Sequence, residues 1–208
     1  MKSLRGALIV IEGCDRSGKT TQCKKIVASL NNIGIQAEYM NFPDRSTAIG
    51  KIINEYLTQK NDISDKAIHL LFSANRWELV PKINKLLQQG TTVVVDRYSY
   101  SGVAFSAIKN GMNLEWCKWS DAGLPKPDLV LLLTLSMEAM NSRGGFGEER
   151  YEKNEIQQEV VKVFRELKDS TWKEIDADRS MEDLHAELLS HVKEAVERSK
   201  TSPLKQLW

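Results

Sequence analysis

The segment at residues 13–20 constrains the fold of this chain more than any other. It reads Gly-Cys-Asp-Arg-Ser-Gly-Lys-Thr and fits the pattern G-x-x-x-x-G-K-[ST], between an apolar, β-branched run at 7–12 and helical spacing at 17–30. A strand, a glycine turn and a helix in this order form a phosphate-binding loop, because backbone N–H groups and the helix N-terminus surround the anion. Lys19 is then placed to reach the β- and γ-phosphates of a nucleotide, and the Thr20 hydroxyl to ligate Mg²⁺.

A phosphate-binding loop alone does not separate an enzyme that transfers phosphate from a nucleotide-gated switch or motor. The Asn-Lys-x-Asp sequence that reads guanine in GTPases is absent, since Asn84-Lys85 is followed by Leu86-Leu87. A GTPase is therefore disfavoured, and further motifs must decide among the other classes.

The rest of the chain alternates strands with helices. Strands are expected at 7–12, 35–41, 91–95 and 129–135, with a weaker one at 172–176, and helices at 17–30, 48–57, about 102–109, 151–169 and 181–198. The stretch 65–89 is helical throughout, and Pro81 is able to open its second half. This alternation predicts a three-layer α/β/α fold around a mainly parallel five-stranded sheet. No repeat or linker divides the chain, which predicts a single domain over 1–208.

Composition excludes several classes of protein. The chain has 29 Lys+Arg against 28 Asp+Glu, which disfavours binding to nucleic acid or membrane through a broad basic surface. Its longest apolar runs, at 7–11 and 129–133, are far shorter than the roughly 18 residues of a membrane span. Three cysteines without a CxxC pair, and an N-terminus without a cleavage site, predict an intracellular protein with neither disulfides nor a zinc site.

Charged residues follow two of the predicted strands. Asp96 and Arg97 come after the run at 91–95, at the carboxyl edge of the sheet where ligands bind in open α/β folds. Asp96 can hold Mg²⁺ through water or approach a nucleophile, and Arg97 can donate to a phosphate. A structural salt bridge between them is the alternative. Arg45, after the strand at 35–41, is a second candidate to bind a monophosphate.

Aromatic residues at helical spacing are candidates for nucleoside binding. Phe72 and Arg76 are spaced i, i+4, so the ring can stack on a base while the guanidinium donates to its edge. Viewed alone, such a pair is more often a core Phe and a surface Arg. Ser101 and Phe105 have the same spacing, and Phe105 either excludes a ribose 2′-hydroxyl or belongs to the core.

A glycine-rich segment predicts a mobile lid over about 136–150. Arg143 and Arg150 flank the glycines at 144–147, as a lid that closes over phosphates and excludes water requires. An exposed charged loop is the alternative.

Six segments in this order resemble the motifs of eukaryotic and poxviral thymidylate (dTMP) kinases: GCDRSGKT, NFPDRST, HLLFSANRWE, VVVDRYSYSGVAFS, GLPKPDLVL and RGGFGEERYE. The resemblance runs from about Arg5 to about Glu159 and returns in the ending at 203–208. It implies the P-loop kinase fold, Mg²⁺ as cofactor, a homodimer, and transfer of the γ-phosphate of ATP to dTMP, giving dTDP and ADP in dTTP biosynthesis. The composition and the cysteines described above predict a cytoplasmic protein without a nucleic-acid or membrane partner, and they leave partial nuclear residence open.

The resemblance also implies a role for each matching residue. The catalytic residues are Arg16, Lys19, Asp96 and Arg97, and the metal ligands are Thr20 and Asp96. The ATP-binding residues are Gly13, Arg16, Ser17, Gly18, Lys19, Thr20, Thr21 and Arg143. The dTMP-binding residues are Asp15, Phe42, Arg45, Phe72, Arg76, Arg97, Ser101, Gly102, Phe105, Arg150, Tyr151 and Gln157.

Within these sets the resemblance is more specific. Arg16 bridges the donor and acceptor phosphates, Asp15 binds the sugar 3′-hydroxyl, and Arg143 lies near adenine. Arg45 and Arg97 bind the dTMP phosphate, while Tyr151 and Gln157 complete the nucleoside pocket.

Two alternatives stay open at this point. One is a P-loop kinase that acts on another nucleoside monophosphate or on an unphosphorylated deoxynucleoside, although the pair Arg45 and Arg97 favours a phosphorylated acceptor. The other is a nucleotide-binding module without phosphate transfer, which acceptor-dependent ADP release would exclude.

Overall fold

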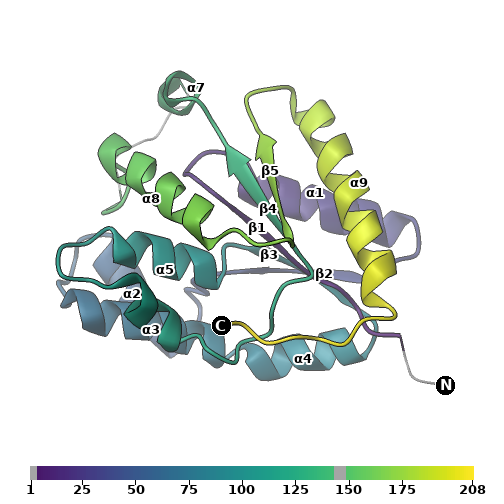
Figure 1. Ribbon diagram of the computed structural model, residues 1–208, viewed down its shortest axis with the longest axis horizontal. Coiled ribbons are helices and arrows are strands. Elements are labelled where there is room, and N and C mark those ends of the chain that lie inside the picture. The colour runs from purple at the N-terminus through teal and green to yellow at the C-terminus, as the bar shows by residue number, and fades with distance from the viewer. Residues whose placement is uncertain (1–3, 143–148) are drawn as a thin grey trace.

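Five strands form one parallel sheet in the computed structural model, which describes residues 4–142 and 149–208. The strands are β1 (Leu8–Gly13), β2 (Ala37–Asn41), β3 (Thr92–Asp96), β4 (Leu129–Thr134) and β5 (Trp172–Asp176). Their order across the sheet is β2-β3-β1-β4-β5, and every neighbouring pair is parallel (Figure 1). The predicted five-stranded parallel sheet is confirmed.

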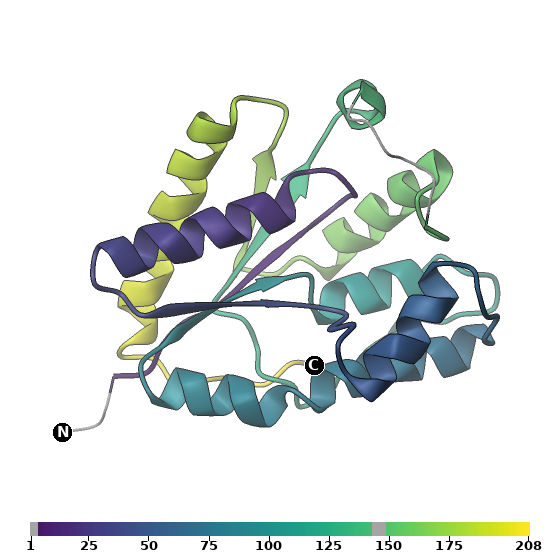
Figure 2. The same ribbon diagram turned by 180° about the vertical axis from the view of Figure 1, so that it is seen from behind.

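Helices cover both faces of this sheet. On one face lie α1 (Lys19–Asn32) and α9 (Met181–Ser199), and on the other lie α4 (Val80–Gln88), α5 (Ser99–Ala107) and α8 (Asn154–Leu167) (Figures 1 and 2). Outside α5 pack α3 (Asp65–Trp77) and α6 (Leu114–Trp119), and α2 (Ala48–Leu57) packs against α3. A short helix, α7 (Met137–Ser142), follows β4. The predicted three-layer α/β/α fold is confirmed.

The central strand β1 is buried on both faces. Leu8 and Val10 belong to the core under α4, α5 and α8, while Ile9 and Ile11 belong to the core under α1 and α9. Each strand residue alternates between the two cores because successive side chains point to opposite faces. The only polar side chain of β1, that of Glu12, lies at the carboxyl end of the strand.

The first residues of α1 and α5 differ from the starts that the apolar spacing of the sequence predicted. α1 starts at Lys19, two residues after the predicted position, because Gly18 is its N-cap in a left-handed conformation. α5 starts at Ser99, three residues before the predicted position, because the Glu12 carboxylate accepts the backbone N–H groups of Tyr98 and Ser101. That capping contact comes from β1, far away in the sequence.

The long helical stretch predicted at 65–89 is two helices, and two short helices were not predicted. α3 ends at Trp77, and α4 begins at Val80 with Pro81 in its first turn. α6 has six residues, too few for a periodic pattern, and Asn113 caps it by accepting the Trp116 N–H at 3.0 Å. α7 lies within the predicted lid segment.

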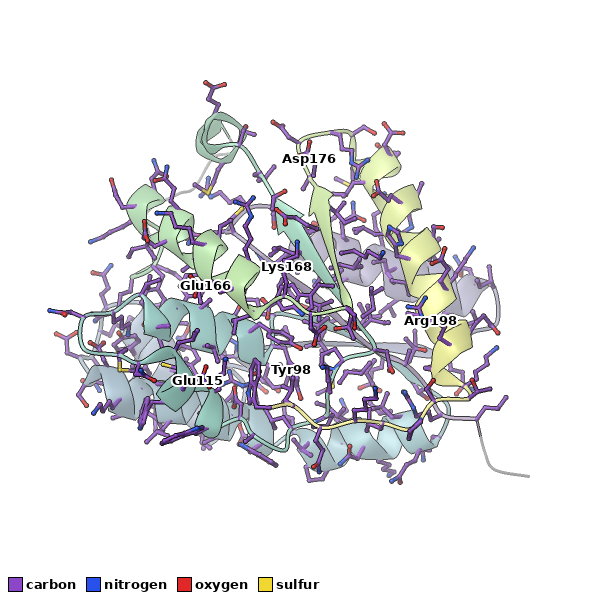
Figure 3. All side chains as sticks on the ribbon, viewed as in Figure 1. Tyr98, Glu115, Glu166, Lys168, Asp176 and Arg198 are labelled. Carbon is purple, nitrogen blue, oxygen red and sulfur yellow. The ribbon has the colours of Figure 1, made fainter. Side chains whose placement is uncertain are left out.

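Figure 3 shows how the side chains divide between the interior and the surface. Tyr98 lies in the middle of the molecule, whereas Glu115 and Arg198 lie on outer helices. None of the helices within residues 4–142 and 149–208 combines the length and the apolar character needed to cross a membrane.

Candidate active site

The phosphate loop begins where β1 ends. Gly13 has a φ of 141°, and a Cβ atom there would lie 2.2 Å from the Leu133 carbonyl oxygen, so this position requires glycine. Gly18 has a φ of 86° and starts α1. The first N–H groups of α1 have no partner inside the helix and face the loop, which makes the loop an anion-binding site.

Lys19 is the first residue of α1 and is almost completely buried. Its Nζ donates to the Cys14 carbonyl oxygen at 2.6 Å. Burial, and next the neighbouring Arg97 guanidinium, lower the pKa of the Lys19 ammonium. The lysine is therefore held against the loop itself, where a phosphate would meet it.

Thr20 and Asp96 form the candidate metal site. The Thr20 hydroxyl donates to the Asp96 carboxylate, which lies at the end of β3, opposite Ile11 of β1. No group of three or more His, Cys, Asp or Glu side chains in the described part of the chain could hold a metal ion. Two oxygen ligands beside a phosphate site fit Mg²⁺, which usually keeps several waters and binds substrate phosphates.

Arg97 and Asp15 form an ion pair between the phosphate loop and the end of β3. Arg97 also donates to the Gly13 carbonyl oxygen at 3.2 Å and to the Ser101 hydroxyl at 3.1 Å. Burial raises the pKa of the Asp15 carboxyl, but the charges of Arg97 and Lys19 outweigh it, and the pKa lies below its usual value. Asp15 is therefore an anionic acceptor inside the site.

Gln157, on α8, holds Asp15 in place. Its side-chain oxygen accepts the Asp15 N–H at 2.9 Å, and its nitrogen donates to the Asp15 carboxylate at 2.7 Å. The same nitrogen donates to the Tyr151 carbonyl oxygen at 3.0 Å. Gln157 thus connects α8 to the phosphate loop, a role that its predicted place in the nucleoside pocket did not include.

Glu12 is a supporting residue of the site that the sequence analysis did not identify. It is completely buried and accepts from the N–H groups of Tyr98 and Ser101 at 2.9 and 3.0 Å and from the Ser101 hydroxyl at 2.5 Å. Burial raises the pKa of its carboxyl. One feature of the sequence could have identified it: Glu12 is the only charged residue of an otherwise apolar strand, and a buried carboxylate needs hydrogen-bond partners.

Arg76 lies inside the protein, paired with Asp121. The pair is bidentate, with nitrogen–oxygen distances of 2.7 and 3.2 Å, and the two side chains are 2% and 0% exposed. Asp121 also accepts from the hydroxyls of Ser73 and Ser99 at 2.7 and 2.6 Å. The alternative of a surface arginine at this position is wrong. Its partner lies 45 residues away, where no local pattern points to it.

Three aromatic rings surround the same space. Phe72 projects from α3, and Phe105 from α5, with its ring 5.3 Å from the ring of Tyr151. The Arg97 guanidinium lies 5.5 Å from the centre of the Phe105 ring. A flat apolar group would fit between α3 and α5, close to the guanidinium groups of Arg76 and Arg97.

These residues line one cavity of about 680 Å³. From the predicted sets it includes Asp15, Arg16, Gly18, Lys19, Thr20, Thr21, Phe42, Arg45, Phe72, Arg76, Asp96, Arg97, Ser101, Gly102, Phe105 and Tyr151. The wall also contains residues that were not predicted, among them Lys24, Tyr39, Asn41, Tyr98, Ser106, Glu149 and Glu152. The phosphate loop and the aromatic pocket are therefore two ends of one site.

Four predicted residues within the described ranges do not line this cavity. Gly13 and Ser17 lie in the loop behind it, and Gln157 lies behind Asp15. Arg150 turns away, donates to the Tyr56 carbonyl oxygen at 3.1 Å and pairs with Asp62. Arg143 lies outside the described residues.

Comparison with known proteins decides the family. A family model described as thymidylate kinase matches residues 11–188. Over an alignment of 211 positions the chain is 49% identical to the thymidylate kinase of Homo sapiens, with 100% of both chains covered. The chain belongs to the thymidylate kinase family. It is also 50% identical to the thymidylate kinase of Arabidopsis thaliana over 208 positions, which cover 98% of this chain and 78% of that protein.

The fold agrees with a solved thymidylate kinase. The structure of thymidylate kinase from Candida albicans superposes with a TM-score of 0.88 at 39% sequence identity, and the match covers 99% of this chain and 100% of that one. The resemblance that the six sequence motifs indicated is confirmed. In this thymidylate kinase family member, residues from five of the motifs line one cavity, and the segment GLPKPDLVL at 123–131 contributes none of the described lining.

Loss of Asp121 is expected to destabilise the protein strongly. Asp121→Ala leaves the Arg76 guanidinium buried without a counter-ion, which costs about 3–5 kcal/mol of unfolding free energy. Urea unfolding measures the loss. The control is Glu159→Ala, which removes the exposed ion pair to Lys162 and should change stability little. Equal losses of unfolding free energy in the two variants would contradict a stabilising role of Asp121 toward Arg76.

Proposed function

We propose that this protein is an ATP-dependent dTMP kinase, which transfers the γ-phosphate of ATP to dTMP and releases dTDP and ADP. The observation that carries this proposal is the continuity of the cavity. A phosphate loop lies at one end, the Phe72–Arg76 pair at the other, and the cation Arg97 between them. Family membership supports the same reaction, which supplies dTDP for dTTP biosynthesis.

On the donor side, the loop at 13–20 and Thr21 bind the phosphates of ATP. Lys19 neutralises charge on the transferred group, and Arg16 bridges the donor and acceptor phosphates. Thr20 would hold Mg²⁺ directly, and Asp96 would complete its shell through water. Their contact beside the loop supports this assignment. Mg²⁺ would offset the negative charge of the ATP phosphates. Arg143 belongs to this side by family resemblance alone.

On the acceptor side, Phe72 stacks on the thymine ring and Arg76 donates to its edge. Arg97 and Arg45 bind the dTMP phosphate, and Asp15 accepts from the sugar 3′-hydroxyl. Arg45 is half exposed at the mouth of the cavity and pairs with Glu149 at 2.8 Å, so a phosphate would replace one anionic partner with another. The lid predicted at about 136–150 would close over the two substrates, and its residues 143–148 lie outside the described part of the chain. Phe42, Ser101, Gly102, Phe105 and Tyr151 line the pocket around the nucleoside.

In this proposal the chain acts as one domain in the cytoplasm, and partial residence in the nucleus stays open. Strands from residue 8 to residue 176 belong to a single sheet, which supports one domain. Cys14, Cys23 and Cys117 are buried free thiols, which fits a reducing compartment.

ADP release with one acceptor at a time tests the proposed function. Purified protein with ATP and Mg²⁺ is given dTMP, dUMP, dCMP, dAMP, dGMP, AMP, UMP or thymidine. We expect turnover to be fastest with dTMP and to stop when EDTA removes the metal ion. A preference for dCMP or a purine nucleotide would contradict the assignment of the base pocket. If no acceptor produced turnover, a nucleotide-binding module without phosphate transfer would become the favoured function.

Lys19→Ala is expected to lower kcat at least about 10²-fold while dTMP binding changes little, because the lysine acts on charge that develops during transfer. Steady-state kinetics and calorimetric titration with dTMP measure the two quantities. The matched control is Lys25→Ala, on the outer side of the same helix. Unchanged turnover in Lys19→Ala would refute the catalytic role.

The homodimer implied by the family resemblance has a candidate interface on α3 and α6. Leu70, Trp77 and Trp119 are 49%, 38% and 69% exposed. Trp77 donates to the Ser120 carbonyl oxygen at 2.8 Å, which brings the end of α3 against the end of α6. Large apolar side chains gathered on two neighbouring helices mark a protein–protein contact.

We expect the wild-type protein to sediment as a dimer and Trp119→Glu to sediment as a monomer, since a charge in an apolar interface is unfavourable. Analytical ultracentrifugation measures the mass. Met181→Glu replaces an apolar side chain of similar exposure (49%) on α9 and should leave the dimer intact. A monomeric wild-type protein would contradict the proposal.

A further inference from the structure

Asn75 is a completely buried polar residue that none of the roles assigned above uses. It lies on α3, next to Arg76 in the chain, and its side chain contacts the loop at 42–47 between β2 and α2. This loop carries Arg45, whose side chain lines the cavity. A buried amide needs hydrogen-bond partners, and those of Asn75 show what holds the loop in place.

Asn75 bonds to both backbone groups of Asp44, the residue immediately before Arg45. Its Oδ1 accepts the Asp44 N–H at 2.8 Å, and its Nδ2 donates to the Asp44 carbonyl oxygen at 3.2 Å. A backbone N–H only donates, so the first bond fixes the orientation of the amide. The N–H and the carbonyl belong to the two peptide units that flank Asp44, and the second of these units leads into Arg45. Neither unit can turn without breaking a bond.

The same amide nitrogen connects the loop to the start of α2. It lies 3.0 Å from the Thr47 hydroxyl and 2.6 Å from the carboxylate of Glu78, the residue that ends α3. Thr47 is the N-cap of α2, and its hydroxyl accepts the Gly50 N–H at 2.9 Å. A Cβ atom at Gly50 would lie 1.8 Å from the Asp44 carbonyl oxygen, so the first turn of α2 packs directly on that carbonyl. One buried amide thus joins α3, the loop and α2.

We propose that Asn75 is the positioning residue for Arg45, the guanidinium that binds the phosphate of dTMP in the proposed function, on which this inference rests. Arg45 lies one residue after Asp44, and its side chain is 41% exposed at the mouth of the cavity. A long exposed side chain loses conformational freedom when it binds an anion, and a backbone that is already fixed lowers this cost. Asn75 is not among the described residues of the cavity wall, so it acts on the phosphate only through Arg45.

Calorimetric titration of Asn75→Ala with dTMP and with thymidine tests the inference. We expect the Kd for dTMP to rise about tenfold, because the bond between guanidinium and phosphate weakens. The Kd for thymidine, which has no phosphate, should not change. The matched control is Asn31→Ala: Asn31 bonds to the N–H and the carbonyl oxygen of Ala37, at the start of β2, at 2.9 and 3.1 Å. Its loss should change neither Kd. Equal weakening of dTMP and thymidine in Asn75→Ala would overturn the inference.

A double-mutant cycle shows whether Asn75 acts through Arg45. In Arg45→Ala the guanidinium is gone, so adding Asn75→Ala should raise the Kd for dTMP no further. Additive effects of the two substitutions would overturn the inference, while binding and turnover of dTMP by the wild-type protein leave the proposed function in place. A wild-type protein that does not bind dTMP would overturn both.

Glu78→Ala carries the same test where Asn75→Ala does not fold. Glu78 is exposed, and its carboxylate accepts from the Asn75 amide at 2.6 Å and from the Thr47 hydroxyl at 2.7 Å. Its loss loosens the amide, so the Kd for dTMP should rise about two- to threefold in the wild-type background and not at all in Arg45→Ala. The Kd for thymidine should stay the same. An unchanged Kd for dTMP in Glu78→Ala would then contradict the positioning role.

Discussion

The site depends on the parallel pairing of β1 with β3 and β4. In a parallel sheet the carboxyl ends of all strands meet at one edge, so the phosphate loop after β1 and Asp96-Arg97 after β3 become neighbours. The register places Ile11 opposite Asp96, and the Arg97 N–H donates to the Ile11 carbonyl oxygen at 3.0 Å. The metal site, the Arg97–Asp15 pair and the start of α5 all follow from that alignment.

Buried charge is the second organising feature. Glu12, Arg76 and Asp121 lie away from water, where an unpaired charge is strongly unfavourable. Glu12 and Asp121 each accept from several partners, and Arg76 is held by both oxygens of Asp121. Glu12 fixes the start of α5, and Asp121 fixes the guanidinium at the base end of the cavity. A polar network of this kind positions side chains more tightly than apolar packing, because its bonds are directional.

The strand and helix pattern of the sequence predicted the sheet and most helices, because long periodic segments and buried β-branched runs are strong signals. The predicted start of α5 was wrong because the group that caps this helix, the Glu12 carboxylate, belongs to β1. α6 was missed because six residues hold no periodicity. The burial of Arg76 could not be read from the sequence, where a surface arginine was the alternative, because its partner Asp121 follows that missed helix. The start of α5 and the burial of Arg76 share one cause, which is contact between segments distant in the sequence, whereas α6 is too short for a periodic pattern.

The sequence by itself determined the chemistry at the carboxyl end of the first strand: a glycine loop for phosphate, Lys19, Thr20 and the Asp96-Arg97 pair. Local geometry suffices for these because the residues are contiguous and their backbone conformation is set by glycines and by the helix start. Only the tertiary structure decided which side chains support them. Gln157 on Asp15, Glu12 under α5, Asp121 on Arg76 and Asn75 on Asp44 each join elements that are far apart in the chain. No periodicity or motif encodes such pairs, since they form only when the sheet and its two helical layers bring those elements together.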